Sequence, residues 1–247
     1  MSYKLELNPS YENFKHILLN IKAIFAQNSD TIHLARNELK VIPLENIETV
    51  VKAFRIPNLL NRFVYAYIRK SKAYKAFHNA QKLHDLGVAT PEAIGYIEFY
   101  SFGLLAESFF ISKKFDYDFT IAHIRDDQPS YKKQVLEDFA RFTYAIHQKS
   151  VWHVDYSGGN ILVKQQDEGY SFSLVDINRM KFRSITGYEG LENFNKLWFN
   201  EEDLTTIAKV YAKEADLDER KAIQEILLHD RKLKNKIELK RKLKGKA

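Results

Sequence analysis

Three oxygen-bearing side chains stand at spacings typical of phosphoryl transfer. Asp155 and Asn160 are five residues apart in a glycine-containing loop, and Asp176 ends the second of two strand-like runs that follow. In phosphoryl transfer a loop carboxylate accepts a hydroxyl proton, while an amide and a second carboxylate hold Mg²⁺ against ATP phosphates. We therefore predict Asp155 as the catalytic base, and Asn160 and Asp176 as nucleotide-binding residues and Mg²⁺ ligands.

The same residues also fit a plain polar turn. Asp, Ser, Gly and Asn all favour turns, so the loop could connect a helix to a strand without any chemistry. Asp176 would then cap the end of a strand. The spacing His153-x-Asp155-x₄-Asn160, with a helix before it and a strand after it, favours the catalytic interpretation. In that interpretation His153 supports the loop by packing and hydrogen bonding.

A lysine inside an apolar strand is the next candidate. Lys52 lies in the segment Thr49-Val50-Val51-Lys52-Ala53-Phe54. A half-buried ammonium group needs a partner, and the α- and β-phosphates of ATP are the partner that kinases supply. The alternative is a lysine on an edge strand whose long side chain reaches water.

Composition places the chain among soluble globular proteins. Its 247 residues are 45% apolar and 28% charged, and the longest apolar runs fall short of a bilayer-spanning segment. The N-terminus lacks the basic and apolar regions of a signal peptide. The absence of cysteine excludes disulfides, thiolate metal sites and a cysteine nucleophile. These features fit a cytoplasmic protein.

The net charge of +6 is concentrated at the C-terminus. Residues 231–246 hold nine basic residues and one acid, which leaves 29 basic and 31 acidic residues in the rest of the chain. The near-neutral body argues against nucleic-acid binding by the folded core. Three interpretations of the basic tail remain: a solvated helix end, a patch that adheres to an anionic membrane surface, or, ranked last, a phosphate-binding patch for nucleic acid.

Hydrophobic periodicity predicts the order of the elements. Strand patterns appear in a hairpin over residues 31–44 and in the segments 48–54, 93–99 and 104–111, with a helical stretch over 60–86. Helices are predicted at 131–148, 191–199, 201–213 and 219–228. His147, on the buried side of the helix at 131–148, is interpreted as a core histidine with satisfied hydrogen bonds.

This order predicts an α+β, two-lobed protein-kinase-like fold. An antiparallel sheet and a helix would form the N-terminal lobe over residues 1–112, and a mostly helical C-terminal lobe over 113–230 would carry the catalytic loop. Residues 231–247 would be the basic tail. The hinge falls at 112–118.

Four segments together resemble the lipopolysaccharide kinase family, which comprises the Kdo kinases and core heptose kinases of Gram-negative bacteria. They are Val50–Phe54, Leu83–Pro91, the loop His153–Leu162 and Val175–Arg179. The resemblance implies an enzyme, peripheral on the cytoplasmic side of the inner membrane, that uses ATP to phosphorylate a sugar hydroxyl of a lipid-linked core oligosaccharide. It gives Lys52, Asp155, Asn160 and Asp176 the roles stated above. Arg179 would contact substrate or fix the metal loop, and otherwise would be a surface arginine paired with an acid.

Two features depart from the kinase pattern. No glycine precedes Gly87, so the turn at 28–30 or 35–37 lacks the residue that lets backbone amides approach phosphates. The helix after Lys52 should also supply a glutamate to that lysine, yet Ala76 stands near the expected position, and Asp85 is the only acid between Arg55 and Pro91. Asp176 or an acid from elsewhere would then hold Lys52.

Two other functions share these residues. A small-molecule kinase of the aminoglycoside or choline type would use the same Asp155, Asn160 and Asp176. A pseudokinase scaffold that binds nucleotide or lipid would explain the missing glycine-rich loop and helix glutamate. A protein kinase is disfavoured, because only 71 residues follow Asp176 and Ala-Pro-Glu is absent from them.

Overall fold

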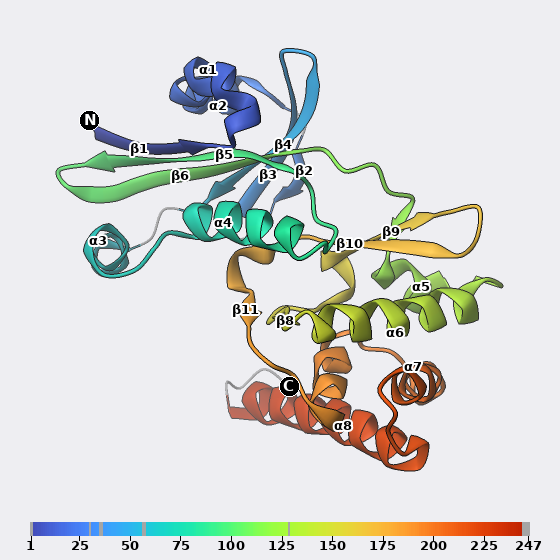
Figure 1. Ribbon diagram of the computed structural model, residues 1–247. Helices are drawn as coiled ribbons and strands as arrows, with labels where there is room; N and C mark the ends of the chain where they lie inside the picture. Colours follow the sequence, from blue (N-terminus) through green and yellow to red (C-terminus); the bar gives the residue numbers. More distant parts are fainter. Residues whose placement is uncertain (1, 30, 35–36, 56–57, 128, 244–247) are drawn as a thin grey trace. The chain divides into compact units, whose positions relative to one another are not determined.

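The chain folds into two compact units, Met1–Phe115 and Asp116–Ala247. The structure is a computed structural model that describes residues 2–29, 31–34, 37–55, 58–127 and 129–243. The first unit is a sheet with helices on both faces, and the second is mostly helical with a three-stranded and a two-stranded sheet (Figure 1). The predicted α+β class, with an antiparallel N-terminal sheet and a mostly helical C-terminal part, is confirmed.

Six antiparallel strands form the sheet of the first unit, in the order β1-β5-β6-β4-β3-β2. The strands are β1 (Ser2–Leu7), β2 (Thr31–Leu34), β3 (Asn37–Leu44), β4 (Ile47–Phe54), β5 (Ala93–Ser101) and β6 (Leu104–Lys113). All strands predicted from the sequence are present. The edge strand β1, which pairs with β5, was not predicted.

A hydrophobic core covers one face of this sheet. The covering elements are a 3₁₀ helix at Pro9–Phe14, α1 (Lys15–Leu19) and α2 (Ile21–Gln27). Leu18 and Phe25 from these helices are buried in one cluster with Val51 of β4 and Ile111 of β6. Because successive side chains of a strand point to opposite faces, Lys52 must project from the other face.

The other face of the sheet is covered by α4 (Lys72–Asp85). The ring of Phe77 lies 5.5 Å from that of Tyr96 on β5. Tyr96 is paired across the sheet with Phe110, and Phe110 with Lys52. Lys52 therefore shares the sheet face on which α4 packs.

The helical stretch predicted over residues 60–86 is two helices, so the prediction of one continuous stretch is wrong. α3 (Leu59–Tyr67) ends before Ser71, and α4 begins immediately after it. Ser71 has an extended backbone, and its hydroxyl accepts a hydrogen bond from the N–H of Tyr74 at 3.0 Å. This N-cap satisfies a free N–H at the start of α4 and requires a non-helical residue there.

The second unit is built around α6 (Lys132–Gln148), which confirms the predicted helix at 131–148. Phe139 of α6 packs against the rings of Tyr156 and Phe194, both fully buried. The remaining elements are β7 (Phe119–Thr120), α5 (Ile121–Asp127), β8 (Val151–Trp152), β9 (Ile161–Gln165), β10 (Tyr170–Leu174), β11 (Lys181–Phe182), α7 (Glu201–Glu214) and α8 (Glu219–Leu243).

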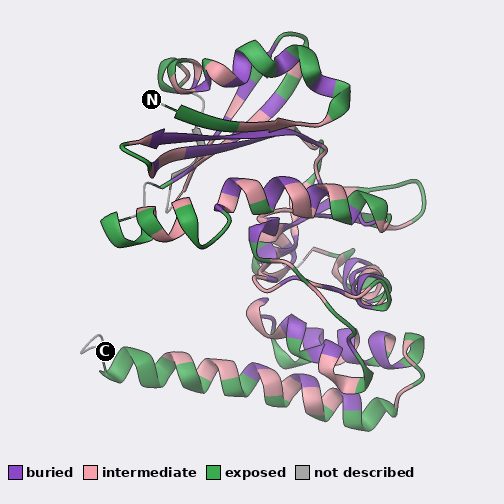
Figure 2. Ribbon diagram, turned by 60° about the vertical axis from the view of Figure 1, so that its left-hand side comes forward, coloured by how far each residue is buried: buried purple, intermediate pink, exposed green. Residues whose placement is uncertain are grey.

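Two segments of the second unit differ from the prediction. The helix expected at 191–199 is a 3₁₀ run at Gly187–Lys196. The last helix continues past residue 228 to Leu243, so the basic residues up to that point are helical and mostly exposed (Figure 2). No helix in the described ranges combines the length and apolar character needed to cross a membrane.

Because β5 packs closely against β1 and α1, we predict that one methyl group added at Gly95 destabilises the fold. A Cβ added at Gly95 would lie 2.8 Å from the carbonyl oxygen of Glu6 and 2.9 Å from a methyl carbon of Leu18. We expect Gly95→Ala to lower the free energy of unfolding by about 1–3 kcal/mol, as overpacking does. The control is Gly159→Ala, because no neighbour lies within 4 Å of its added Cβ. Equal denaturant midpoints for the two variants would contradict the expectation.

Candidate active site

The loop between β8 and β9 is closed by hydrogen bonds on the carbonyl oxygen of Asp155. The side-chain Nδ2 of Asn160 donates to this oxygen at 2.9 Å, and the N–H of Ser157 donates to it at 2.8 Å. The loop then enters a short 3₁₀ turn, where Gly158 approaches α5: a Cβ there would be 2.9 Å from the backbone nitrogen of Ala122. Backbone contacts thus fix the amide of Asn160 and leave its oxygen as the atom that could ligate a metal.

The β9–β10 hairpin brings Asp176 to the same end as Asn160. Leu174 is paired with Ile161, and the next N–H, from Val175, donates to the carbonyl oxygen of Asn160 at 3.0 Å. Asp176 itself has a left-handed backbone, φ 55° and ψ 43°, a conformation that aspartate tolerates better than most residues. Its Oδ1 accepts a hydrogen bond from the side chain of Asn178 at 2.7 Å. Asn178 thereby orients this carboxylate.

His153 connects the two acids through their backbones. Its Nδ1 accepts from the N–H of Asp155 at 3.1 Å, and its Nε2 bonds to the carbonyl oxygen of Val175 at 2.9 Å. A carbonyl can only accept, so Nε2 carries the proton and the ring is the neutral Nε2–H tautomer. Burial lowers the pKa of His153, chiefly by desolvating the charged form, which favours this neutral state.

Lys196 places a positive charge beside the proposed base. Its Nζ lies 3.3 Å from Oδ1 of Asp155 and donates to the carbonyl oxygen of Val154 at 2.6 Å. It stands at the end of the 3₁₀ run Gly187–Lys196, 41 residues from Asp155 in sequence, and was not among the predicted site residues. No motif or periodicity marks it. Arg179, which was predicted, is exposed in the short 3₁₀ helix that follows Asp176.

A buried polar chain supports the loop from below. The hydroxyl of Tyr211 on α7 donates to Nδ1 of His147, 2.9 Å away, and Nε2 of His147 bonds to Oδ1 of Asn193 at 3.1 Å. The amide nitrogen of Asn193 then donates to the carbonyl oxygen of His153 at 2.9 Å. His147 is therefore the satisfied core histidine that the sequence predicts, and its bonds connect two helices to the catalytic loop.

The donor set fits Mg²⁺ that is held partly by a nucleotide. Mg²⁺ prefers oxygen ligands and is commonly bound by one or two protein groups together with phosphates and water. Asn160 and Asp176 would supply an amide oxygen and a carboxylate at one end of the hairpin. Among the described residues, no cluster of three or more His, Cys, Asp or Glu forms a separate metal site.

In the first unit, Lys52 is half-buried and its Nζ lies 5.5 Å from the ring centroid of Phe54. The face of α4 toward the sheet is apolar, and Ala76, at the position where a kinase helix carries its glutamate, is buried. The fully buried carboxylate in the described part of this unit is Glu98 on β5, which accepts a hydrogen bond from Tyr100. Through Ser108, Glu98 is in register with Phe54, so it shares the sheet face of Lys52.

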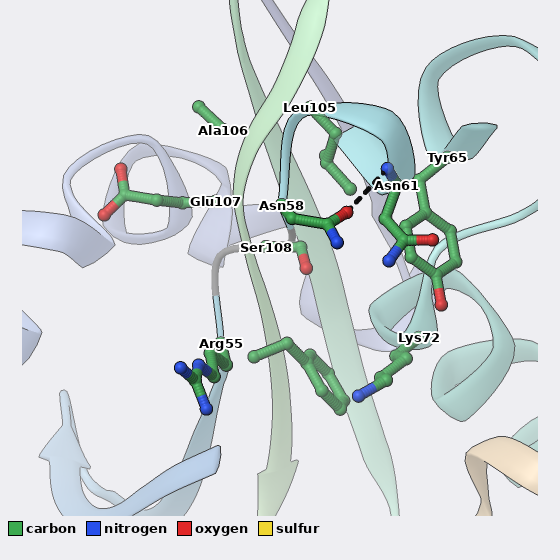
Figure 3. A pocket seen from close by; sticks show the side chains of 10 residues that line it. Arg55, Asn58, Asn61, Tyr65, Lys72, Leu105, Ala106, Glu107 and Ser108 are labelled. Atoms are coloured by element: carbon green, nitrogen blue, oxygen red, sulfur yellow. Dashed lines mark hydrogen bonds between the residues drawn. The ribbon is translucent and has the colours of Figure 1, made fainter. Parts of the chain in front are cut away.

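The turns predicted to cover nucleotide phosphates include residues outside the described ranges. The described residues exclude Ala35 and Arg36, which connect β2 to β3. They also exclude Asp30 of the other candidate turn. The first unit does contain a cavity of about 350 Å³ beside α3, between the end of β4 and β6 (Figure 3). Arg55 and Lys72 line it together with Asn58, Asn61 and Tyr65.

Burial of His147 predicts an acid-sensitive fold. Burial lowers the pKa of this ring from 6.5 to about 4. The unfolded chain therefore binds the proton more tightly, and the free energy of unfolding should fall as the pH drops from 6.5 toward 4, by up to about 1.4 kcal/mol per pH unit for this group. Denaturant titrations of the parent and of His147→Gln would measure this. The slope should shrink in the variant, and an unchanged slope would contradict the assignment.

Comparison with known proteins agrees with this geometry. The sequence pattern of the lipopolysaccharide kinase (Kdo/WaaP) family matches residues 58–219. A 3-deoxy-D-manno-octulosonic acid kinase of Pasteurella multocida (strain Pm70) is 25% identical over 146 residues. The match covers 56% of this chain and 58% of that protein, so this chain spans less than two thirds of the curated relative.

Solved structures with the same fold include WaaP in complex with acyl carrier protein, at a TM-score of 0.63 and 18% identity, covering 94% of this chain and 98% of that one. An aminoglycoside-3'-phosphotransferase of type VIII matches at a TM-score of 0.54 and 10% identity, covering 87% of this chain and 99% of that one. These two likenesses show the fold, which is the predicted protein-kinase-like fold. By its match over residues 58–219, the chain belongs to the lipopolysaccharide kinase (Kdo/WaaP) family.

Proposed function

We propose that this protein is an ATP-dependent kinase that phosphorylates a Kdo or heptose hydroxyl of lipid-linked lipopolysaccharide core. The observation that carries the proposal is the hydrogen-bonded loop and hairpin, which hold Asn160 and Asp176 at one end of β9–β10 and Asp155 in the same loop. Membership of the family and the Kdo kinase name of the Pasteurella relative support the substrate class.

Asp155 would act as the base. Its carboxylate accepts the proton of the acceptor hydroxyl while that oxygen forms a bond to the γ-phosphorus and the bond to the ADP oxygen breaks. Lys196, 3.3 Å from Oδ1, holds the carboxylate in place and adds positive charge where negative charge gathers. The backbone bond from Asp155 to His153 keeps the loop in position during this transfer.

Asn160 and Asp176 are the proposed Mg²⁺ ligands, and Lys52 the proposed contact to the α- and β-phosphates. When bound, Mg²⁺ neutralises charge on the phosphate oxygens. Arg179, exposed after the metal loop, is proposed to contact the acceptor, with His153 as the supporting residue.

A cytoplasmic location at the inner membrane surface follows from a lipid-linked acceptor. The helical basic segment of α8 is proposed to adhere to anionic headgroups, since each basic side chain near such a surface contributes about 1 kcal/mol. Of the three leucines of this segment, Leu239 and Leu243 are exposed and Leu233 is half-buried, so adhesion through charge suits it better than insertion.

Removing the base should stop transfer without stopping nucleotide binding. We expect Asp155→Asn to lower kcat by about 10²–10⁴-fold, because the acceptor proton loses its carboxylate. The matched control is Asp167→Asn, an exposed aspartate in the turn at the other end of the same hairpin. ADP release with a lipid-linked core acceptor is the readout for transfer, and a thermal shift with ATP and Mg²⁺ is the readout for binding.

The same pair of measurements tests the scaffold alternative, which the buried Ala76 on α4 motivates. A parent protein that binds ATP and Mg²⁺, retains its fold and transfers no phosphate to any lipid-linked core acceptor would refute the kinase proposal. Binding that also persists in Asp155→Asn would then favour a nucleotide-binding scaffold.

Acceptor preference separates the proposal from a small-molecule kinase. We expect kcat/KM for a lipid-linked core oligosaccharide to exceed that for aminoglycosides or choline by at least about 10³-fold, since binding energy from the rest of the acceptor raises transfer. Competition between the two acceptor classes in one ATP-consumption assay measures the ratio. Preference for the soluble amines would assign the protein to the other class.

A further inference from the structure

The helix α3 carries its apolar face outward. Within α3 and the residue after it, five large apolar side chains are exposed: Leu59 (71%), Leu60 (74%), Phe63 (49%), Tyr67 (66%) and Ile68 (68%). No residue of α3 is buried, and Figure 2 shows only exposed and intermediate colours along it. Most surface helices of globular proteins point such a stripe toward the core.

The polar side of α3 faces the protein instead. Asn61 and Tyr65 line the cavity beside β6, as Figure 3 shows. Nε of Arg62 donates to the carbonyl oxygen of Leu105 at 2.8 Å and so attaches the helix to the end of β6. The hydrogen bond of Arg62 therefore orients α3 with its polar side toward β6 and its apolar stripe outward.

The turn between β5 and β6 extends this apolar surface. Phe102 is 102% exposed and has a left-handed backbone with φ 50°. The adjoining Gly103 touches α3, because a Cβ there would be 2.9 Å from the hydroxyl of Tyr67. One exposed apolar surface results, the α3 surface, which consists of Leu59, Leu60, Phe63, Tyr67, Ile68 and Phe102.

The segment of the chain that carries α3 is basic. From Arg55 to His84 the sequence contains seven basic residues and no acid. Arg69 and Lys70, which directly follow Ile68 in the sequence, are exposed. An interfacial helix at a membrane combines aromatic and aliphatic side chains, which enter the acyl boundary, with basic side chains, which meet anionic headgroups.

We propose that the α3 surface docks on an anionic lipid bilayer, with α3 lying in the interface and Phe102 inserted beside it. The exposed turn and the basic α3 segment favour an anionic lipid surface, since each basic side chain near such a surface contributes about 1 kcal/mol. The purpose of this docking, to bring the enzyme to a lipid-linked acceptor, rests on the proposed function. The docking itself is independent of nucleotide and acceptor.

Vesicle sedimentation tests the apolar part of the α3 surface. We expect the full chain to bind vesicles of phosphatidylglycerol and phosphatidylcholine, and Leu60→Ser/Phe63→Ser and Phe102→Ser each to weaken binding at least about tenfold. Leu228→Ser is the control, because this leucine is 41% exposed, comparable with the 49% of Phe63, and precedes the basic segment of α8. Unchanged binding in the α3 variants, or an equal loss in the control, would overturn the assignment.

Vesicles of different lipid charge test whether Arg69 and Lys70 contribute to binding. Binding should weaken about fivefold for each charge removed in Arg69→Gln and Lys70→Gln, and the weakening should vanish on pure phosphatidylcholine. A Phe102→Trp variant whose emission is quenched by brominated acyl chains, beyond the quenching of the parent, would support insertion of the turn. No added quenching would overturn insertion of the turn.

A second copy of the chain is the main competing occupant. Light scattering without lipid would then show a dimer that Leu60→Ser/Phe63→Ser converts to a monomer, and this result would overturn the membrane proposal. Because none of these measurements uses ATP or a sugar acceptor, their failure leaves the kinase proposal standing. Loss of phosphate transfer in the parent would likewise leave the vesicle result unaffected.

Discussion

The site depends on two hydrogen bonds made by one buried imidazole. His153 receives the N–H of Asp155 on Nδ1 and donates from Nε2 to the carbonyl of Val175, so it joins the catalytic loop to the strand that leads into Asp176. Both partners are backbone groups, which means that the ring fixes the paths of two chain segments and leaves the carboxylates themselves available. The arrangement needs a neutral ring, and burial provides it by lowering the pKa of His153.

A second neutral histidine extends this support into the helices. The chain from Tyr211 through His147 and Asn193 to the carbonyl of His153 satisfies both ring nitrogens of His147 and both polar atoms of the Asn193 side-chain amide. Buried polar networks of this kind specify one arrangement strongly when complete and are costly when any member is lost. The groups that form this network all belong to the second unit, and Lys52 belongs to the first.

Local spacing allowed much of this to be predicted. The residues of the loop and hairpin lie within about two dozen positions of one another in the sequence. The alternation of the strands and the residues typical of turns therefore predict that Asn160 and Asp176 lie at the same end of the hairpin. Lys196 and Asn193 approach the loop only through tertiary packing of a 3₁₀ run, which has no sequence period to detect. The break before α4 was missed because the Ser71 cap interrupts a pattern that is apolar on both sides. β1 was missed because half of its residues are exposed and charge interrupts its apolar positions.

The continuous helix α8 limits how its charge can be used. Seven basic residues lie between Arg231 and Leu243, and at 100° per residue they project in all directions around the axis. A flat surface touches a cylinder along one line. Side chains on the far side of a helix about 10 Å across stand farther away than the roughly 8 Å over which salt screens charge. A disordered tail could turn every cation toward one plane, whereas this rod presents only a fraction of its cations to the plane of a membrane, so the proposed adhesion through α8 draws on that fraction alone.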